Sequence, residues 1–371
     1  MTTRIKPPFR SDHVGSLLRP QALLDARVRW KAGEMTDDEL RAEENRHITA
    51  VVRLQESTGI GSVTDGEYRR ENFHRDFIDR IEGVEFKPMM PPGSEGASID
   101  PEKAPFVALV HERMKRPAGG IEVENYKVVA GLTDTPVKVA IPSPTMTHFR
   151  GGREAISRDA YPDIEGFFAD LARVYREELA GLAEAGCRYV QFDDTNLAYL
   201  CDEGMREGVR QLGEDPDALP ATYAALINDA VRGRPDDMSV CIHMCRGNAQ
   251  SQWFAAGGYE PIAEQVFSLT EVDGFFLEYD DERSGDFAPL RFVPEGKAIV
   301  LGLVTTKRGE LESGDALKRR IDEAAKYVPL DQLCLSPQCG FSSNAIGNLI
   351  TEDDEIAKLR LVVDVASEVW N

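Results

Sequence analysis

The sequence lacks long apolar runs and has little cysteine. No stretch approaches the roughly 18 consecutive apolar residues of a membrane-spanning helix, and residues 1–10 contain no apolar segment of the signal-peptide kind. Six cysteines in 371 residues are too sparse for a disulfide scaffold. These absences argue against a membrane protein and a disulfide-stapled secreted protein. We expect a cytoplasmic protein whose thiols are free to bind metal.

Positive charge is also scarce. The chain has 43 Lys and Arg against 64 Asp and Glu, a formal net charge of −21. Nucleic acids and anionic membranes both require a basic face, so neither is an expected partner. No glycine-rich phosphate loop follows an early strand, which disfavours an open, doubly wound nucleotide-binding sheet. We expect small-molecule ligands.

Strand-like segments alternate with helical ones along most of the chain. A helix is predicted to start at Thr36, where a capping threonine precedes Glu39 by three residues, and to run to about Thr58. Other helices are predicted over residues 73–81, 164–185, 221–232, 261–269, 315–327 and 354–369. Eight strands are predicted near residues 11, 62, 138, 190, 240, 275, 299 and 333. This pattern predicts an α/β fold, a (β/α)8 TIM barrel forming one catalytic domain over residues 1–371. An open sheet is the alternative.

The pattern changes between strands 2 and 3, over about residues 82–136. Prolines and glycines punctuate short β-like runs at residues 107–110 and 126–129. We interpret this segment as an insertion of hairpins and loop that acts as a lid or as a contact in a homo-oligomer. Decoration without a role is the alternative.

Candidate metal ligands follow three of the predicted strands. His243 and Cys245 lie two residues apart, so on an extended strand both side chains face the same way. Glu278 ends the run Gly-Phe-Phe-Leu-Glu, and Cys339 follows the run that ends in Ser-Pro-Gln. Two cysteines, one histidine and one glutamate make a tetrahedral zinc (Zn²⁺) set. The alternative is a hydrogen-bonded core histidine with small buried cysteines.

Other polar residues cluster at predicted strand ends. Asp193 and Asp194 form an acid/base pair, or one of them caps the next helix. Lys307 follows the seventh strand, and we expect it to bind an anionic part of a substrate rather than donate a proton, because its ordinary pKa is about 10.4. Further candidates for anion or donor binding, with surface solvation or packing as the alternative, are Arg19, Arg69, Arg70, Arg246, His13, His148, Phe149 and Arg150.

These residues resemble the carboxyl-terminal catalytic barrel of cobalamin-independent methionine synthase, and in particular the single-barrel members of that family. The resemblance covers nearly the whole chain and implies that His243, Cys245, Glu278 and Cys339 bind zinc. It implies that Ser16 and Glu67 hold the amino acid part of homocysteine and that Asp193 binds its amine. The family's full-length enzymes carry Asp-x-His after the seventh strand and a second barrel. Here residues 305–307 read Thr-Thr-Lys.

The leading hypothesis is a zinc-dependent S-methyltransferase that methylates the homocysteine thiol, with Asp193 and Lys307 as catalytic residues. The methyl donor is 5-methyltetrahydropteroyltriglutamate or another donor. The alternative is a zinc-dependent thiol alkyltransferase of the epoxide:coenzyme M type. Two further hypotheses are a metal-free decarboxylase of the uroporphyrinogen type and a binding protein with a purely structural zinc.

Overall fold

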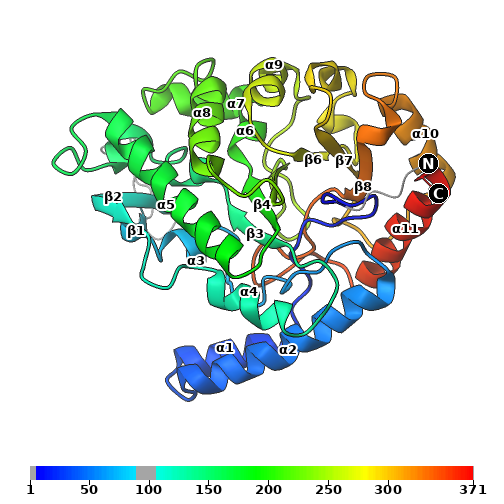
Figure 1. Cartoon of the computed structure of the whole chain (residues 1–371), viewed down its shortest axis with the longest axis horizontal. Helices are drawn as coiled ribbons and strands as arrows, with labels where there is room; N and C mark the ends of the chain where they lie inside the picture. Colours follow the sequence, from blue (N-terminus) through cyan, green and yellow to red (C-terminus); the bar gives the residue numbers. More distant parts are fainter. Residues whose placement is uncertain (1–5, 89–105, 371) are drawn as a thin grey trace.

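A parallel sheet forms the centre of the molecule. A computed structural model describes residues 6–88 and 106–370, with the strands inside and the longer helices around them (Figure 1). The six strands lie in chain order, each paired in parallel with the next. They are β3 (Val139–Pro142), β4 (Tyr189–Asp194), β5 (Ser239–Met244), β6 (Gly274–Glu278), β7 (Ala298–Val304) and β8 (Leu333–Pro337). Nearly every strand residue is buried, as expected for a parallel sheet covered on both faces.

Two of the eight predicted strands are single bridges in the structure. Ser11 bridges Leu335 of β8, and Val63 bridges Val137 just before β3. Near Ser11 the backbone is held locally, because Asp12 accepts hydrogen bonds from the N–H groups of Phe9 and His13 (3.1 and 2.8 Å). Such side-chain bonds compete with ladder pairing and limit the length of a strand.

Helices connect the strands at positions close to those predicted. Thr36 and Glu39 form the predicted capping box, and this helix ends at Thr58, before Gly59 in the left-handed region. The helices are α1 (Gln21–Lys31), α2 (Asp37–Thr58), α3 (Arg75–Ile78), α4 (Val123–Ala130), α5 (Ile164–Glu184), α6 (Asn196–Tyr199), α7 (Glu203–Gln211), α8 (Leu219–Val231), α9 (Glu260–Leu269), α10 (Gly314–Ala324) and α11 (Glu352–Trp370).

The segment between the second and third predicted strands differs in part from its prediction. β1 (Glu82–Pro88) and β2 (Phe106–Lys115) form an antiparallel pair, as a hairpin requires. Residues 126–129, predicted to be β-like, lie instead in helix α4, which packs against α2 and α5. The start of this helix is fixed by Glu178 of α5, which accepts hydrogen bonds from the N–H groups of Ile121 and Glu122. Residues 89–105 lie outside the described residues, and the assignment of 82–136 as an insertion stays a prediction.

The predicted helix over residues 73–81 is also shorter than expected. Only α3 forms there, and Asn72 accepts a hydrogen bond from the N–H of His74 (3.1 Å) at its start.

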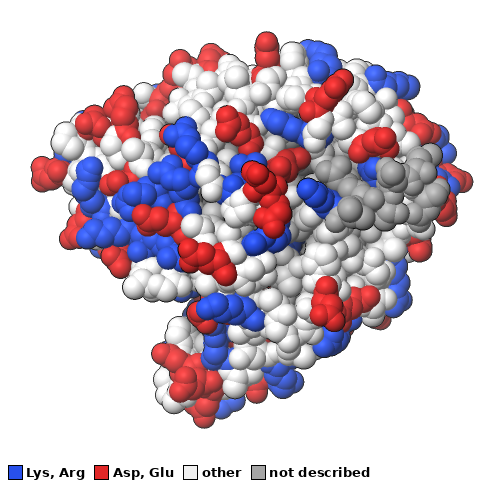
Figure 2. All heavy atoms as spheres, viewed as in Figure 1, with Lys and Arg blue, Asp and Glu red and all other residues white. Residues whose placement is uncertain are grey.

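Both signs of charge are interspersed over the face in Figure 2, with many basic side chains over α5 and the β1–β2 pair. No helix within residues 6–88 and 106–370 combines the length and apolarity needed to cross a bilayer.

Candidate active site

A cavity of about 210 Å³ opens where the central strands end. Its walls come from the ends of β4 and β5, from the segments that follow β3, β4, β5 and β8, and from residues within 14–16 and 67–74. Active sites of parallel α/β folds lie at the carboxyl ends of the strands. The cavity brings together six of the eight predicted site residues, which are Ser16, Glu67, Asp193, His243, Cys245 and Cys339.

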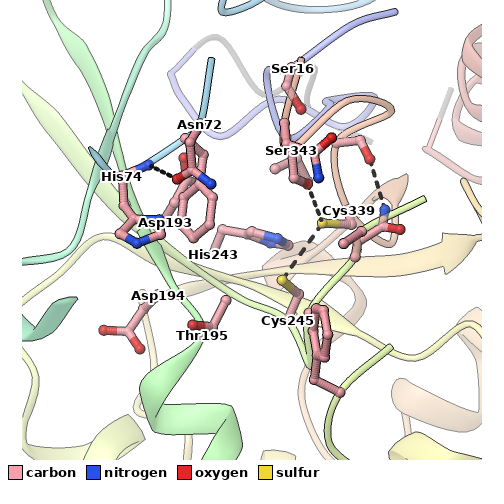
Figure 3. Close-up of a pocket in the computed structure, with 18 of the residues that line it drawn as sticks. Ser16, Asn72, His74, Asp193, Asp194, Thr195, His243, Cys245, Cys339 and Ser343 are labelled. Atoms are coloured by element: carbon pink, nitrogen blue, oxygen red, sulfur yellow. Dashed lines mark hydrogen bonds between the residues drawn. The ribbon is translucent and has the colours of Figure 1, made fainter. Parts of the chain in front are cut away.

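His243, Cys245 and Cys339 converge in this cavity (Figure 3). Their candidate ligand atoms all lie within 4.8 Å of one another, and all three residues are buried. The two sulfurs are 3.6 Å apart and are not joined by a disulfide. Neither ring nitrogen of His243 has a hydrogen-bond partner, although both are buried. An imidazole without protein partners beside two thiols fits a tetrahedral zinc site with an open position.

The two cysteines are not equivalent. Their mutual hydrogen bond lowers the pKa of the Cys339 thiol well below its ordinary value and raises the pKa of Cys245 well above it. The neighbouring His243 further lowers the pKa of Cys339. The protonation of the two thiols is therefore coupled. A thiolate is the form in which cysteine binds metal.

Glu278, the predicted fourth ligand, lies at the end of β6 but outside the 4.8 Å group. Its Oε2 accepts a hydrogen bond from the N–H of Arg246 (2.6 Å), and its Oε1 accepts from Arg283 and Lys307 (2.7 and 3.1 Å). Burial acts to raise its pKa, but the charges of Lys307, Arg246 and Arg283 outweigh burial and lower it to about 2. Glu278 is therefore ionised, and Arg246, Arg283 and Lys307 fix its carboxylate at the end of β6.

Lys307 does not line the cavity. Its ammonium lies 3.1 Å from Glu278 Oε1 and 3.0 Å from Asp280 Oδ2. The sequence predicted an anion-binding role for Lys307, and in the structure the bound anions are two carboxylates of the chain itself. Because the Lys307 side chain is 12% exposed and both carboxylates are nearly inaccessible, this is an interior ion-pair network.

We expect Lys307→Met to lower the midpoint of thermal unfolding at pH 7 and Lys307→Arg to retain it. Removing the Lys307 ammonium leaves the buried carboxylates of Glu278 and Asp280 without one of their cationic partners. The lost cation also raises the pKa of Glu278, so the stability deficit should shrink as the pH falls and the carboxylates take up protons. Thermal unfolding from pH 3 to pH 8 measures this, because the deficit should shrink below about pH 4.5, the ordinary pKa of Glu278. A Lys307→Met protein of unchanged stability that binds the methyl donor weakly would instead support the role predicted from the sequence.

Glu67 and Asp193 place two carboxylates in the cavity wall. Burial raises the pKa of Glu67 to about 8, with a further contribution from the charge of Asp193. Burial likewise raises the pKa of Asp193 to about 6, although His243 and Gln191 act to lower it. Glu67 Oε2 is buried without a hydrogen-bond partner, and the residue has a positive φ of 60°. Two buried carboxylates with an unpartnered oxygen fit a cationic ligand.

Ser16 is fixed against the loop that carries Cys339. The N–H of Phe341 donates to the carbonyl of Ser16 (2.9 Å), and the N–H of Ser342 donates to Ser16 Oγ (3.4 Å). A Cβ atom at position 340 would overlap Ser16 Oγ, so Gly340 is required for this close approach. Ser16 is therefore positioned by the same loop that presents Cys339.

Comparison with known proteins identifies the family of this fold and cavity. The family described as "Cobalamin-independent synthase, Catalytic domain" matches residues 9–368. The chain belongs to this family. It is 47% identical to the uncharacterized protein YxjH of Bacillus subtilis (strain 168) over 98% of this chain and 96% of that protein. It is 26% identical to "Methionine synthase" of Pyrococcus abyssi (strain GE5 / Orsay) over 90% of this chain and 86% of that protein.

A solved structure agrees with this assignment. The "Putative Vitamin-B12 Independent Methionine Synthase" of Listeria monocytogenes superimposes with a TM-score of 0.78 and 36% sequence identity, over 99% of each chain. The family resemblance stated from the sequence is thus confirmed, and the parallel α/β fold matches that of this synthase. The cobalamin-independent methionine synthases are methyltransferases.

The departure from the family's full-length enzymes at residues 305–307 has a structural role. Thr306 is buried, and its Oγ1 donates a hydrogen bond to Gln338 Oε1 (2.8 Å) and accepts one from Asn248 Nδ2 (2.9 Å). These bonds connect the loops that follow β5, β7 and β8. Here Thr306 ties the three loops together.

Most of the other polar residues singled out in the sequence serve the fold. Arg19 donates to backbone carbonyls of Glu67, Arg70, Ser342 and Asn344. Five more of these residues bond to side chains or backbone carbonyls of the chain, and none of them lines the cavity. They are Arg69, Arg70, Arg246, His13 and His148. Asp194 accepts a hydrogen bond from the N–H of Leu197 (2.8 Å) at the start of α6. This matches the alternative in which one of the two aspartates caps the next helix. Arg150 does line the cavity.

Several residues that line the cavity were not predicted from the sequence. His74 is buried, and burial together with the charge of Arg150 holds its pKa well below the usual range, so its ring is neutral. Its Nδ1 has no hydrogen-bond partner. No sequence motif marks these residues, most of which lie in irregular loops. They are Asn72, Phe73, His74, Thr195, Tyr199, Asn248 and Phe254.

Proposed function

We propose that the protein is a zinc-dependent methyltransferase that methylates the thiol of homocysteine. The observation that carries this proposal is the shared cavity, in which a His243–Cys245–Cys339 ligand set lies beside a pair of carboxylates. Homocysteine has the matching groups, a thiol for the metal and an ammonium for the carboxylates. Bound zinc would deprotonate the thiol while leaving the sulfur nucleophilic.

The residues of the chain would divide the work as follows. His243, Cys245 and Cys339 would hold the metal, and Glu278, ionised at the end of β6, would be the fourth ligand. Glu67 and Asp193 bind the substrate ammonium, and Ser16 binds its carboxylate end. Lys307 acts through Glu278 by keeping that carboxylate ionised.

We also propose that the sheet closes into the eight-stranded barrel of one catalytic domain. Backbone hydrogen bonds support this. Asp12 N donates to Leu335 O of β8 (3.0 Å), Gly61 N donates to Ser11 O (3.0 Å), and Lys138 N donates to Val63 O (2.8 Å). The two bridging segments thus pair with each other and with both edge strands of the sheet.

A donor screen tests the proposed function. The zinc-loaded protein is incubated with homocysteine and, in separate reactions, with the mono- and triglutamates of 5-methyltetrahydrofolate and with methylcobalamin. A parallel reaction contains coenzyme M and an epoxide. We expect methionine, measured by mass spectrometry, with at least one methyl donor. Product from the epoxide reaction together with no methionine from any donor would favour the alkyltransferase alternative.

A further inference from the structure

A chain of buried hydrogen bonds leads through the interior of the sheet to Asp193. It begins at Lys138, which directly precedes β3 and whose side chain is inaccessible to solvent. The Lys138 ammonium donates to Asp12 Oδ1 (3.0 Å), to Gln191 Oε1 (3.1 Å) and to the carbonyl oxygen of His13. An ammonium has three protons to donate, so each one has an acceptor.

Asp12 holds this ammonium in place. Besides Lys138, its carboxylate accepts hydrogen bonds from Ser62 Oγ (2.9 Å) and from the hydroxyl of Tyr189 (2.8 Å). These partners come from the second bridging segment and from β4. The buried charge pair is thus satisfied on both sides and tied to several elements at once, which fixes its geometry.

Gln191 transmits this geometry to the cavity. Its Oε1 accepts from Lys138, and its Nε2 donates to the carbonyl of Val14 (2.6 Å) and to Asp193 Oδ1 (2.7 Å). A flipped amide would set its NH₂ group against an ammonium and its oxygen against a carbonyl and a carboxylate. The amide therefore has one orientation, with the donor toward Asp193.

Asp193 receives this bond on one oxygen only. Gln191 and Asp193 are two residues apart on β4, so their side chains share a face, and Asp193 lines the cavity whereas Gln191 does not. With Oδ1 taken by Gln191, the carboxylate plane is set and Oδ2 is left for a ligand. We propose that Lys138 and Gln191 are positioning residues that orient Asp193 and so give the site its selectivity for a thiol bearing an ammonium group. This inference rests on the proposed homocysteine acceptor.

The variant Gln191→Glu tests the inference, because it keeps the shape of the side chain and replaces the donor toward Asp193 with an acceptor. Binding of homocysteine and of 4-mercaptobutanoate, which is homocysteine without its amino group, is measured by calorimetry on the zinc-loaded proteins. We expect homocysteine to bind roughly 10-fold more weakly to the variant, because Asp193, no longer oriented by Gln191, makes a poorer charge-assisted hydrogen bond to the ammonium. The affinity for 4-mercaptobutanoate should change little.

Companion variants separate positioning from folding. Gln191→Met removes the donor without adding a charge. Asp12→Asn/Lys138→Met removes both charges of the buried pair together. Both should reduce the preference for homocysteine while the zinc content stays at the wild-type level. In an Asp193→Asn background, Gln191→Met should cause no further loss of that preference.

Each contrary result has a distinct meaning. If the wild-type protein prefers homocysteine and all three variants keep that preference, the positioning role is wrong and the proposed acceptor stands. If the variants lose both thiols and zinc in parallel, the network is structural and the positioning role is again wrong. If the wild-type protein shows no preference for homocysteine, the proposed acceptor is wrong and the inference falls with it.

Discussion

Replacing Cys339 with serine should abolish zinc binding and methyl transfer together. The sulfur of Cys339 lies 3.6 Å from that of Cys245, and Cys245 and His243 lower the pKa of the Cys339 thiol well below its ordinary value, toward the thiolate form that binds metal. A serine hydroxyl stays protonated and is a much poorer zinc ligand. Elemental analysis should find about one zinc per wild-type chain and less than roughly a tenth of that in Cys339→Ser after dialysis. His243→Ala and Cys245→Ser should behave in the same way.

Cys201→Ser provides a matched control. Cys201 is a free cysteine outside the ligand group and should be replaced without loss of zinc. Glu278→Gln should fall between the two, with weaker zinc binding in a folded protein, because a carboxylate is the ligand most easily displaced. Full zinc retention in the His243, Cys245 and Cys339 variants would contradict the metal site.

Replacing Glu67 with glutamine should weaken homocysteine binding by about 10- to 150-fold, the loss of a charge-assisted hydrogen bond to a buried ammonium. Burial raises the pKa of Glu67 to about 8, so in the free protein at pH 7 this carboxyl is mostly protonated. An ammonium ligand requires the carboxylate and therefore expels the proton. The affinity for homocysteine should rise with pH up to about 8.

The raised pKa of Glu67 also affects the stability of the fold. The contribution of Glu67 to stability is present below its unfolded pKa and is lost as the pH rises through about 8.

The number of protons released on binding isolates this effect. Both homocysteine and 4-mercaptobutanoate lose a thiol proton at the metal, and only homocysteine brings an ammonium to Glu67. Calorimetry at pH 7 in buffers of different ionisation enthalpy should show a larger proton release with homocysteine than with 4-mercaptobutanoate. The difference should diminish in Glu67→Gln. Equal proton release from the two thiols in the wild-type protein would show that Glu67 does not bind the amine.

The grouping of His243, Cys245 and Cys339 was predictable because most of its signal is local. His243 and Cys245 share a strand face through the two-residue period of an extended chain, and the structure places both in the cavity. Cys339 was predicted to join them because it follows a strand, and the carboxyl ends of parallel strands meet at one edge of the sheet. The helix start at Thr36 was predictable for a similar reason, because its capping threonine and Glu39 lie three residues apart.

Contacts between distant loops were not predictable. Glu278 is held by Arg283 and Lys307, and no short-range pattern connects these three residues. Residues 126–129 of helix α4 were predicted to be β-like, but packing between α2 and α5 overrides that propensity. Lys138 lies within an apolar strand signal, and nothing in the sequence shows that its ammonium is satisfied by Asp12 and Gln191.

The ligand group joins parts of the chain that the sheet itself keeps apart. β5 and β8 are separated by β6 and β7, and Cys245 lies 94 residues before Cys339. An ion held by both would be a reversible cross-link that closes this long loop in the folded state. Because a ligand that binds only the folded state stabilises it by mass action, resistance to unfolding would follow the free zinc concentration. The abundance of the protein in a cell would then depend on zinc supply as well as on synthesis.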